Sequence, residues 1–105
     1  MHGEYKVPGG KLVVVDLEVV DGRLAAVQVS GDFFLHPDSA LDTINIALLG
    51  QPADAVEEQL TTAVDAALGP SVSLYGVNPQ AVAIAVRRAL DAGDGGGRGP
   101  QEAAP

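Results

Sequence analysis

Few side chains in this sequence could perform chemistry on a substrate. The chain contains no cysteine and two histidines. His2 lies in a terminus that we expect to be flexible, whereas His36 stands between Asp32 and Ser39, within four residues of each. Catalytic Ser-His-Asp sets are assembled from separated parts of a chain, and so close a spacing disfavours the required geometry. We therefore interpret His36 as a solvated or capping imidazole.

The segment Gly9-Gly10-Lys11 could bind an anion. Successive glycine amides can form an anion-binding nest, and a lysine beside them adds a positive charge. A P-loop needs a longer glycine-lysine-hydroxyl pattern at the start of a helix, and here a strand-like run follows instead. A hairpin turn with a flanking lysine is the simpler interpretation, and a phosphate contact stays open beside it.

The two phenylalanines of the chain, Phe33 and Phe34, are adjacent. In extended backbone their side chains point to opposite sides, so at most one of them enters a core easily. The other, next to Asp32, would be exposed and could dock a partner protein. Burial of both rings under helices is the alternative.

The composition of the chain excludes several classes of protein. Its 105 residues carry 14 acidic and 6 basic side chains, a net charge of −8, which argues against nucleic acid as a partner. The absence of cysteine excludes disulfides, thiolate nucleophiles, iron–sulfur clusters and cysteine zinc sites. The sequence also lacks the run of alternating oxygen ligands that a hard-cation loop requires. We therefore expect no bound metal.

Membrane attachment is not expected either. Glycines and prolines interrupt the uncharged stretch of residues 66–85, which disfavours a membrane span. The N-terminus contains Glu4 and lacks the apolar segment of a signal peptide. Because 47% of the residues are hydrophobic, we expect one small domain with a core, in the cytoplasm.

The candidate residues must be positioned by local structure, which begins with strands. Residues 4–7 are expected to form a short edge strand, followed by a turn at Pro8-Gly9-Gly10. Residues 11–20 and 23–30 are rich in β-branched residues and flank Asp21-Gly22. This dipeptide is typical of a type I′ hairpin turn, which needs positive φ at both central positions.

The hydrophobic pattern of this hairpin predicts an irregularity. An unbroken ladder would turn Val27 and Val29 toward the side of the acidic residues of the first strand, away from the core. One extra residue near Ala25-Ala26 turns both valines inward together with Leu24. We therefore predict a β-bulge there.

Two helices are expected next. Residues 36–39 open the first, because Pro37 suits a first turn and Asp38 complements the positive end of the helix dipole, and Gly50 ends it. The second begins around Pro52 and stops at Gly69-Pro70. The apolar stripes expected to be buried are Leu41, Ile44 and Leu48 in the first helix, and Val56, Leu60, Ala63, Val64 and Ala67 in the second.

A third helix is predicted to start at Asn78-Pro79, an N-cap followed by proline in the first helical position. Between the second and third helices, residues 71–77 are a linker or a short extended piece. The stripe expected to be buried is Val82, Val86, Ala89 and Leu90, with Arg87 and Arg88 near the negative end of the helix dipole. Residues 93–105 are rich in glycine and proline and are predicted to be a disordered tail after a folded domain of residues 1–92.

Together these elements predict an α+β fold, in which about three helices cover one face of a small antiparallel meander. Several of its segments then resemble a known family: Lys6-Val7-Pro8-Gly9-Gly10-Lys11-Leu12, Val19-Val20-Asp21-Gly22, Gly31-Asp32-Phe33-Phe34, Leu48-Leu49-Gly50 and Tyr75-Gly76-Val77-Asn78-Pro79. In this order they resemble the C-terminal accessory domain of lipoate-protein ligases, over residues 4–90. The beginning of the chain resembles the split arrangement, in which this domain is a separate small subunit.

The resemblance implies a fold similar to that of the iron–sulfur scaffold and sulfur-acceptor proteins, the SufE/NifU-like fold. It also implies a noncatalytic accessory subunit, which binds the catalytic subunit of lipoate-protein ligase and supports ATP-dependent formation of lipoyl-adenylate. Lipoate, ATP and magnesium would be held by the assembled ligase, and no cofactor by this chain alone. The lipoyl group would then pass to lipoyl domains of 2-oxoacid dehydrogenases or to the glycine cleavage H protein.

We hypothesise two groups of functional residues and no catalytic one. The group near the nucleotide or the partner is Gly9, Gly10 and Lys11, where amides and a cation would stabilise the developing charge of pyrophosphate. The group on the docking surface is Asp32, Phe33, Phe34 and His36. Two other functions stay open: a regulatory or interaction module of another acyltransferase or ligase without lipoate activation, and an independent hydrolase that uses Ser39 and His36.

Overall fold

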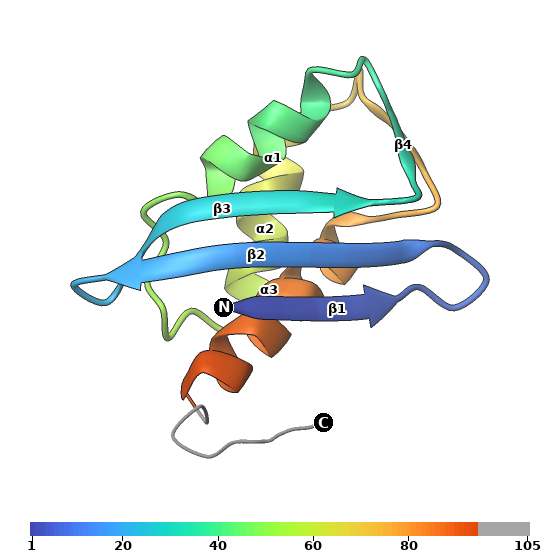
Figure 1. The fold of residues 1–105 in the computed structure, drawn as a ribbon. Helices are drawn as coiled ribbons and strands as arrows, with labels where there is room; N and C mark the ends of the chain where they lie inside the picture. The colour runs from blue at the N-terminus through green and yellow to red at the C-terminus, as the bar shows by residue number, and fades with distance from the viewer. Residues whose placement is uncertain (95–105) are drawn as a thin grey trace.

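The computed structural model describes residues 1–94, in which a three-stranded sheet and a two-stranded ladder accompany three helices (Figure 1). The elements in chain order are β1 (His2–Lys6), β2 (Leu12–Val20), β3 (Arg23–Gly31), β4 (Phe34–His36), α1 (Ala40–Leu48), α2 (Glu57–Leu68), β5 (Ser73–Tyr75) and α3 (Pro79–Asp94). The α+β class is therefore confirmed.

The helices cover one face of the antiparallel sheet β1-β2-β3, as predicted (Figure 1). Helix α3 packs against β1 and β2, α1 packs against β3, and α2 packs against both of these helices. The core lies between these layers, and Val15, Val29 and Val64 are among its fully buried residues. The other face of the sheet faces away from the helices.

The β2–β3 hairpin confirms two predictions made from the sequence. Asp21 and Gly22 have φ angles of 54° and 76°, which are those of a type I′ turn. The register shifts between the pairs Glu18↔Ala26 and Val19↔Leu24, so one extra residue of β3 forms a bulge at the expected place. The bulge turns the apolar residues that follow it toward the helices.

The N-terminal strand is better anchored than the sequence indicates. Strand β1 begins at His2, so the expectation of a flexible terminus there is wrong. Gly3 is buried, and a Cβ at this position would collide with the backbone of α3 at Ala85 and Ala89. Helix α3 also holds the outer edge of β1, because the Arg88 guanidinium donates a hydrogen bond to the carbonyl oxygen of Glu4, at 3.0 Å.

The ladder formed by β4 and β5 was not predicted as a sheet, although residues 71–77 were given an extended conformation as one option. The strands are antiparallel, and Phe34 lies opposite Tyr75, while Leu35 lies opposite Leu74. The Leu35 side chain is buried, whereas Phe34 and Tyr75 are exposed. The ladder therefore has an inner apolar face and an outer face toward solvent.

The first two helices begin later than predicted. Helix α1 starts at Ala40, and Pro37 and Asp38 form the preceding turn, in which the Ala40 amide donates to the Pro37 carbonyl at 2.9 Å. Helix α2 starts at Glu57 rather than around Pro52, because Pro52 bridges to β3. Gly50 and Gly69 follow the ends of the two helices with positive φ, as predicted.

Two residues of the second predicted stripe are exposed, and a third, Ala63, is only half-buried. Val56 precedes α2 and is 61% exposed, and Ala67 is also exposed, so both predictions of burial are wrong. Leu68 takes the buried position instead. The later start of the helix explains Val56, because this residue has extended backbone and is not yet part of a helical face.

Helix α3 confirms its predicted cap and stripe. The Asn78 side chain accepts a hydrogen bond from the Ala81 amide at 2.7 Å, and the predicted stripe is buried: Val82, Val86, Ala89 and Leu90. The helix continues to Asp94, so Arg87 and Arg88 lie in its middle and the predicted role at its negative end is wrong. The Arg87 guanidinium instead binds the carbonyl oxygens of Ala53 and Ala55, at 2.9 and 3.1 Å.

Because α3 includes Gly93 and Asp94, the folded part extends beyond the predicted boundary at residue 92. The rest of the predicted tail, residues 95–105, lies outside the described residues. Within residues 1–94, no helix is long and apolar enough to cross a membrane.

Candidate functional site

Three segments that are far apart in the sequence meet at one end of the molecule. They are the β1–β2 turn, the β3–β4 connection and the end of β5 (Figure 1). The Lys11 amide donates a hydrogen bond to the carbonyl oxygen of Gly76 at 3.1 Å. A Cβ on Gly76 would meet the side chains of Lys11 and Phe33. The Gly9-Gly10-Lys11 group and the Asp32-Phe33-Phe34 part of the second group therefore lie at this end, around Gly76, whereas His36 lies at the other end of β4.

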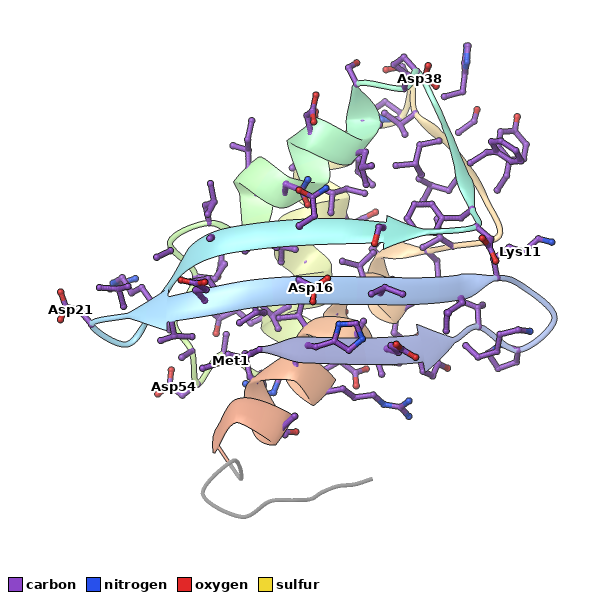
Figure 2. All side chains as sticks on the ribbon, viewed as in Figure 1. Met1, Lys11, Asp16, Asp21, Asp38 and Asp54 are labelled. Atoms are coloured by element: carbon purple, nitrogen blue, oxygen red, sulfur yellow. The ribbon has the colours of Figure 1, made fainter. Side chains whose placement is uncertain are left out.

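The β1–β2 turn uses most of its own amides. The Gly10 amide donates to the Val7 carbonyl at 2.8 Å, and the Lys11 amide is bonded to Gly76. Two of the three amides considered for an anion nest are thus engaged within the chain, and the Gly9 amide and the Lys11 side chain are the groups left to contact an anion. Lys11 is exposed, and Figure 2 shows it at the end of β2 opposite to Asp21.

The two phenylalanines have the opposite orientations that extended backbone dictates. Phe33 packs against the core, and its ring lies so close to Gly31 that a Cβ there would collide with it. Phe34 is 73% exposed, on the outer face of the ladder. Phe33 therefore holds the segment in place, and Phe34 is available to a partner.

The remaining predicted site residues, Asp32 and His36, are exposed near the two ends of β4. His36 lies opposite Ser73 in the ladder. Within residues 1–94, no hydrogen bond joins His36 to Asp32 or to Ser39, and Ser39 accepts at its backbone oxygen from the Thr43 amide. The geometry therefore offers no support for a hydrolase built on these three residues.

The sequence left some residues of this end without a role. Tyr75, opposite Phe34, is 58% exposed. Beside Phe34, a shallow groove of about 240 Å³ separates the ladder from α1 and is lined by Phe33, Phe34, Leu35, Asp38 and Leu41. From the sequence, Tyr75 and Gly76 belong to the linker or short extended piece of residues 71–77 and to the family resemblance, and neither gives them a place at this site. A strand of three residues is too short to show a periodic pattern.

A second polar cluster lies on the open face of the sheet. The His2 ring bridges two carboxylates, with Nε2 at 2.7 Å from Glu4 and Nδ1 at 2.7 Å from Asp16. These two hydrogen bonds, that of Glu4 first, raise the pKa of His2 above its ordinary value. Within residues 1–94 no group of three or more histidine, aspartate or glutamate side chains is arranged to hold a metal ion.

Comparison with known proteins identifies a shared fold. No family model matches the sequence, and no curated protein matches it significantly. A chain of similar structure occurs in an archaeal lipoylation system, a bi-partite lipoate protein ligase and its E2 lipoyl domain from Thermoplasma acidophilum. The match has a TM-score of 0.61 at 23% identity, and covers 83% of this chain and 98% of that chain. The protein therefore has the fold of a chain from that system, over nearly the whole length of that chain.

Proposed function

We propose that this chain is a noncatalytic accessory subunit, which binds the catalytic subunit of lipoate-protein ligase and supports formation of lipoyl-adenylate. One observation carries the proposal. Three of the five segments on which the sequence resemblance rests, residues 6–12, 31–34 and 75–79, meet around Gly76, in a fold shared with a chain of the Thermoplasma system. The sequence pattern and the shared fold favour the same function.

The proposed role is physical rather than chemical. In the adenylation step the lipoate carboxylate attacks the α-phosphate of ATP, and pyrophosphate leaves with its negative charge. A cation held near that charge lowers the barrier, and a subunit that closes over the pocket excludes water and fixes the reacting geometry. Lys11 would supply the cation, because its ammonium is exposed while its stem packs beside Gly76.

The docking residues divide according to their burial. Asp32, Phe34 and His36 are exposed and would contact the catalytic subunit. Phe33 would act through position alone, since its half-buried ring packs against the core and holds the exposed residues in place. Lipoate, ATP and magnesium would be bound by the assembled ligase, and lipoyl domains would be the acceptors.

Reconstitution tests the proposal. The chain is mixed with the lipoate-activating catalytic subunit from the same cell, with lipoate and ATP, and pyrophosphate release is measured with and without the chain. We expect release to require both proteins, and Lys11→Ala to slow it about ten-fold or more. Lys6→Ala, an exposed lysine on β1, is the matched control and should leave the rate unchanged.

The outcomes separate the candidate functions. Substrate turnover by the purified chain alone would contradict a noncatalytic role. Association without any change in pyrophosphate release would favour the alternative, a regulatory or interaction module. An unchanged rate for Lys11→Ala would remove the lysine from the mechanism while leaving the accessory role intact.

A further inference from the structure

The outer face of the β4–β5 ladder is an exposed aromatic surface. Phe34 and Tyr75 are directly opposed across the two strands, so their side chains project to the same side. They are 73% and 58% exposed, and the next pair, His36 and Ser73, continues the same face. No aspartate, glutamate, lysine or arginine belongs to this face. We call these four residues the ladder face.

The residues on the opposite face of the ladder anchor the backbone that carries the ladder face. Leu35 is buried, Leu74 packs against the core, and Phe33 fixes the entry to β4. The hydrogen bond from Lys11 to Gly76 fixes the end of β5. The backbone that carries the two aromatic rings is thus anchored before binding. Binding of a partner would therefore cost little conformational entropy of this backbone.

Aromatic anchors of this kind dominate the binding energy of protein interfaces when a partner covers them. The groove beside Phe34 adds a place for a side chain of the partner, because four of its five lining residues are apolar. The fifth, Asp38, is the charged group of the groove. An apolar side chain with an adjacent cation is the complement of such a groove.

Charge at the ladder and over the whole chain points to the same kind of partner. Asp32 precedes β4 in the chain and Asp38 follows it, and both are exposed. The whole chain carries a net charge of −8. Figure 2 shows Asp38 where β4 leads into α1, at the far end of the ladder from Lys11. A partner surface with arginine or lysine around an apolar site would therefore be attracted and oriented here.

We infer that the ladder face and its groove bind a protein surface that inserts an apolar side chain beside Phe34 and places an arginine or lysine against Asp38. This inference rests on the proposed function, because it takes that partner to be the ligase catalytic subunit. It assigns Tyr75 and Asp38 a role that the sequence did not give them. It also places the main anchor on Phe34 rather than on Asp32 or His36.

Binding of the full chain to the catalytic subunit, measured by calorimetry, tests the inference. Phe34→Ser and Tyr75→Ser should each weaken the affinity about ten-fold or more. Val20→Ser is the matched control, because Val20 is 57% exposed and lies next to Asp21, at the opposite end of the sheet. Unchanged thermal unfolding would establish that the variants fold, as their exposure predicts.

A charge reversal tests the chemistry of the partner without removing an apolar contact. Asp38→Lys should weaken binding about five-fold or more at low salt, and the difference from the wild type should shrink as salt rises. Tighter binding by Asp38→Lys would overturn the expected basic partner.

The results distinguish this inference from the function on which it rests. If the wild-type chain binds and stimulates pyrophosphate release while Phe34→Ser and Tyr75→Ser bind equally well, the inference is wrong and the proposed function stands. If the wild-type chain neither binds nor stimulates the catalytic subunit, both are wrong. Loss of binding in the two aromatic variants, with the Val20 control intact, supports both.

Discussion

Two regions of the molecule place a strand in opposite surroundings. On β1, Gly3 leaves room for the backbone of α3, and Arg88 closes the outer edge through its bond to Glu4. On the β4–β5 ladder, Phe34 and Tyr75 project into solvent. The first arrangement removes polar and apolar groups from water within the chain. The second leaves apolar area that is removed from water only when another surface covers it.

This difference separates residues that stabilise the fold from residues that are free to serve binding. Changes at the contact between β1 and α3 should act on the free energy of unfolding. Changes on the ladder face should act on affinity for a partner and leave the free energy of unfolding nearly unchanged. Changes at the joint between the two regions, around Gly76, should affect both quantities.

The largest effect is expected at Gly3, where the packed region has no spare volume. Gly3→Val would force a side chain into the backbone of α3 at Ala85 and Ala89, and should lower the free energy of unfolding by about 3 kcal/mol or more. Urea unfolding followed by circular dichroism measures this loss. Lys6→Val, on the exposed side of the same strand, should change it by less than about 0.5 kcal/mol. Equal effects at the two positions would show that α3 does not pack on β1 so closely.

The second-largest effect is expected at Gly76, where the β1–β2 turn meets the end of β5. Gly76 has a φ of 85°, and a Cβ there would also collide with the Lys11 side chain. Gly50 has a nearly identical φ of 83° with nothing within 4 Å of an added Cβ. Gly50→Ala should therefore cost about 1 kcal/mol of backbone strain, and Gly76→Ala about 2 kcal/mol or more.

The pair also reports on function. Gly76→Ala should displace Lys11 and reduce pyrophosphate release in the reconstituted ligase, whereas Gly50→Ala should leave it unchanged at a temperature where both variants are folded. Equal free energies of unfolding for the two variants would mean that Lys11 moves aside without cost, and would weaken the view of Gly76 as the joint between the sheet and the ladder.

The parts of the fold that were predictable from the sequence depend on local signals. The Asp21-Gly22 turn, the bulge after it and the Asn78 cap each follow from a few neighbouring residues. The start of α2 was not predictable in this way, because Pro52 satisfies a tertiary bridge to β3 instead of opening a helix. The pairing of β4 with β5 joins segments about forty residues apart, and neither strand is long enough to show alternation.

The residues of the candidate site also differ in whether a local sequence signal or a distant strand pairing determines their position. Adjacent phenylalanines in extended backbone predict that one ring is exposed, and the structure identifies Phe34 as that ring. Tyr75 could not be placed beside it without knowing the pairing of the ladder. The sequence favours a hairpin turn at Gly9-Gly10, but it does not show that the acceptors for the Gly10 and Lys11 amides are the turn itself and Gly76.

The next effect is expected at two helix caps, Asn78 and Ser39, each of which follows a strand of the ladder by three residues. The Asn78 side chain accepts a hydrogen bond from the Ala81 amide, so Asn78→Ala should lower the free energy of unfolding by about 1 kcal/mol. Ser39 stands at the corresponding position of α1 and makes no side-chain cap hydrogen bond. Ser39→Ala should therefore cost less than about 0.5 kcal/mol. The two losses are measured by urea unfolding, and equal values would contradict the observed caps.

The smallest effect is expected on the open face of the sheet, where His2 bridges Glu4 and Asp16. The two carboxylates raise the folded-state pKa of His2 above its ordinary 6.5. The charged imidazole therefore stabilises the fold below pH 6.5, and this contribution is lost as the pH rises through the folded-state value. Because the side chains are about half exposed, it should stay below about 1 kcal/mol and weaken with salt.

His2→Gln isolates this contribution. The wild type should be more stable than the variant at about pH 5.5, and the difference should vanish at about pH 9, where the imidazole is neutral in both the folded and the unfolded chain. Lys6→Gln, which changes a neighbouring charge on the same strand, should show no such loss between the two pH values. A difference that grows with pH would contradict this contribution. A difference of equal size at the two pH values would mean that a hydrogen bond of the ring to one carboxylate, rather than the charge of the ring, stabilises the fold. The open face would then belong with the contact between β1 and α3 as a part of the molecule that serves stability at every pH.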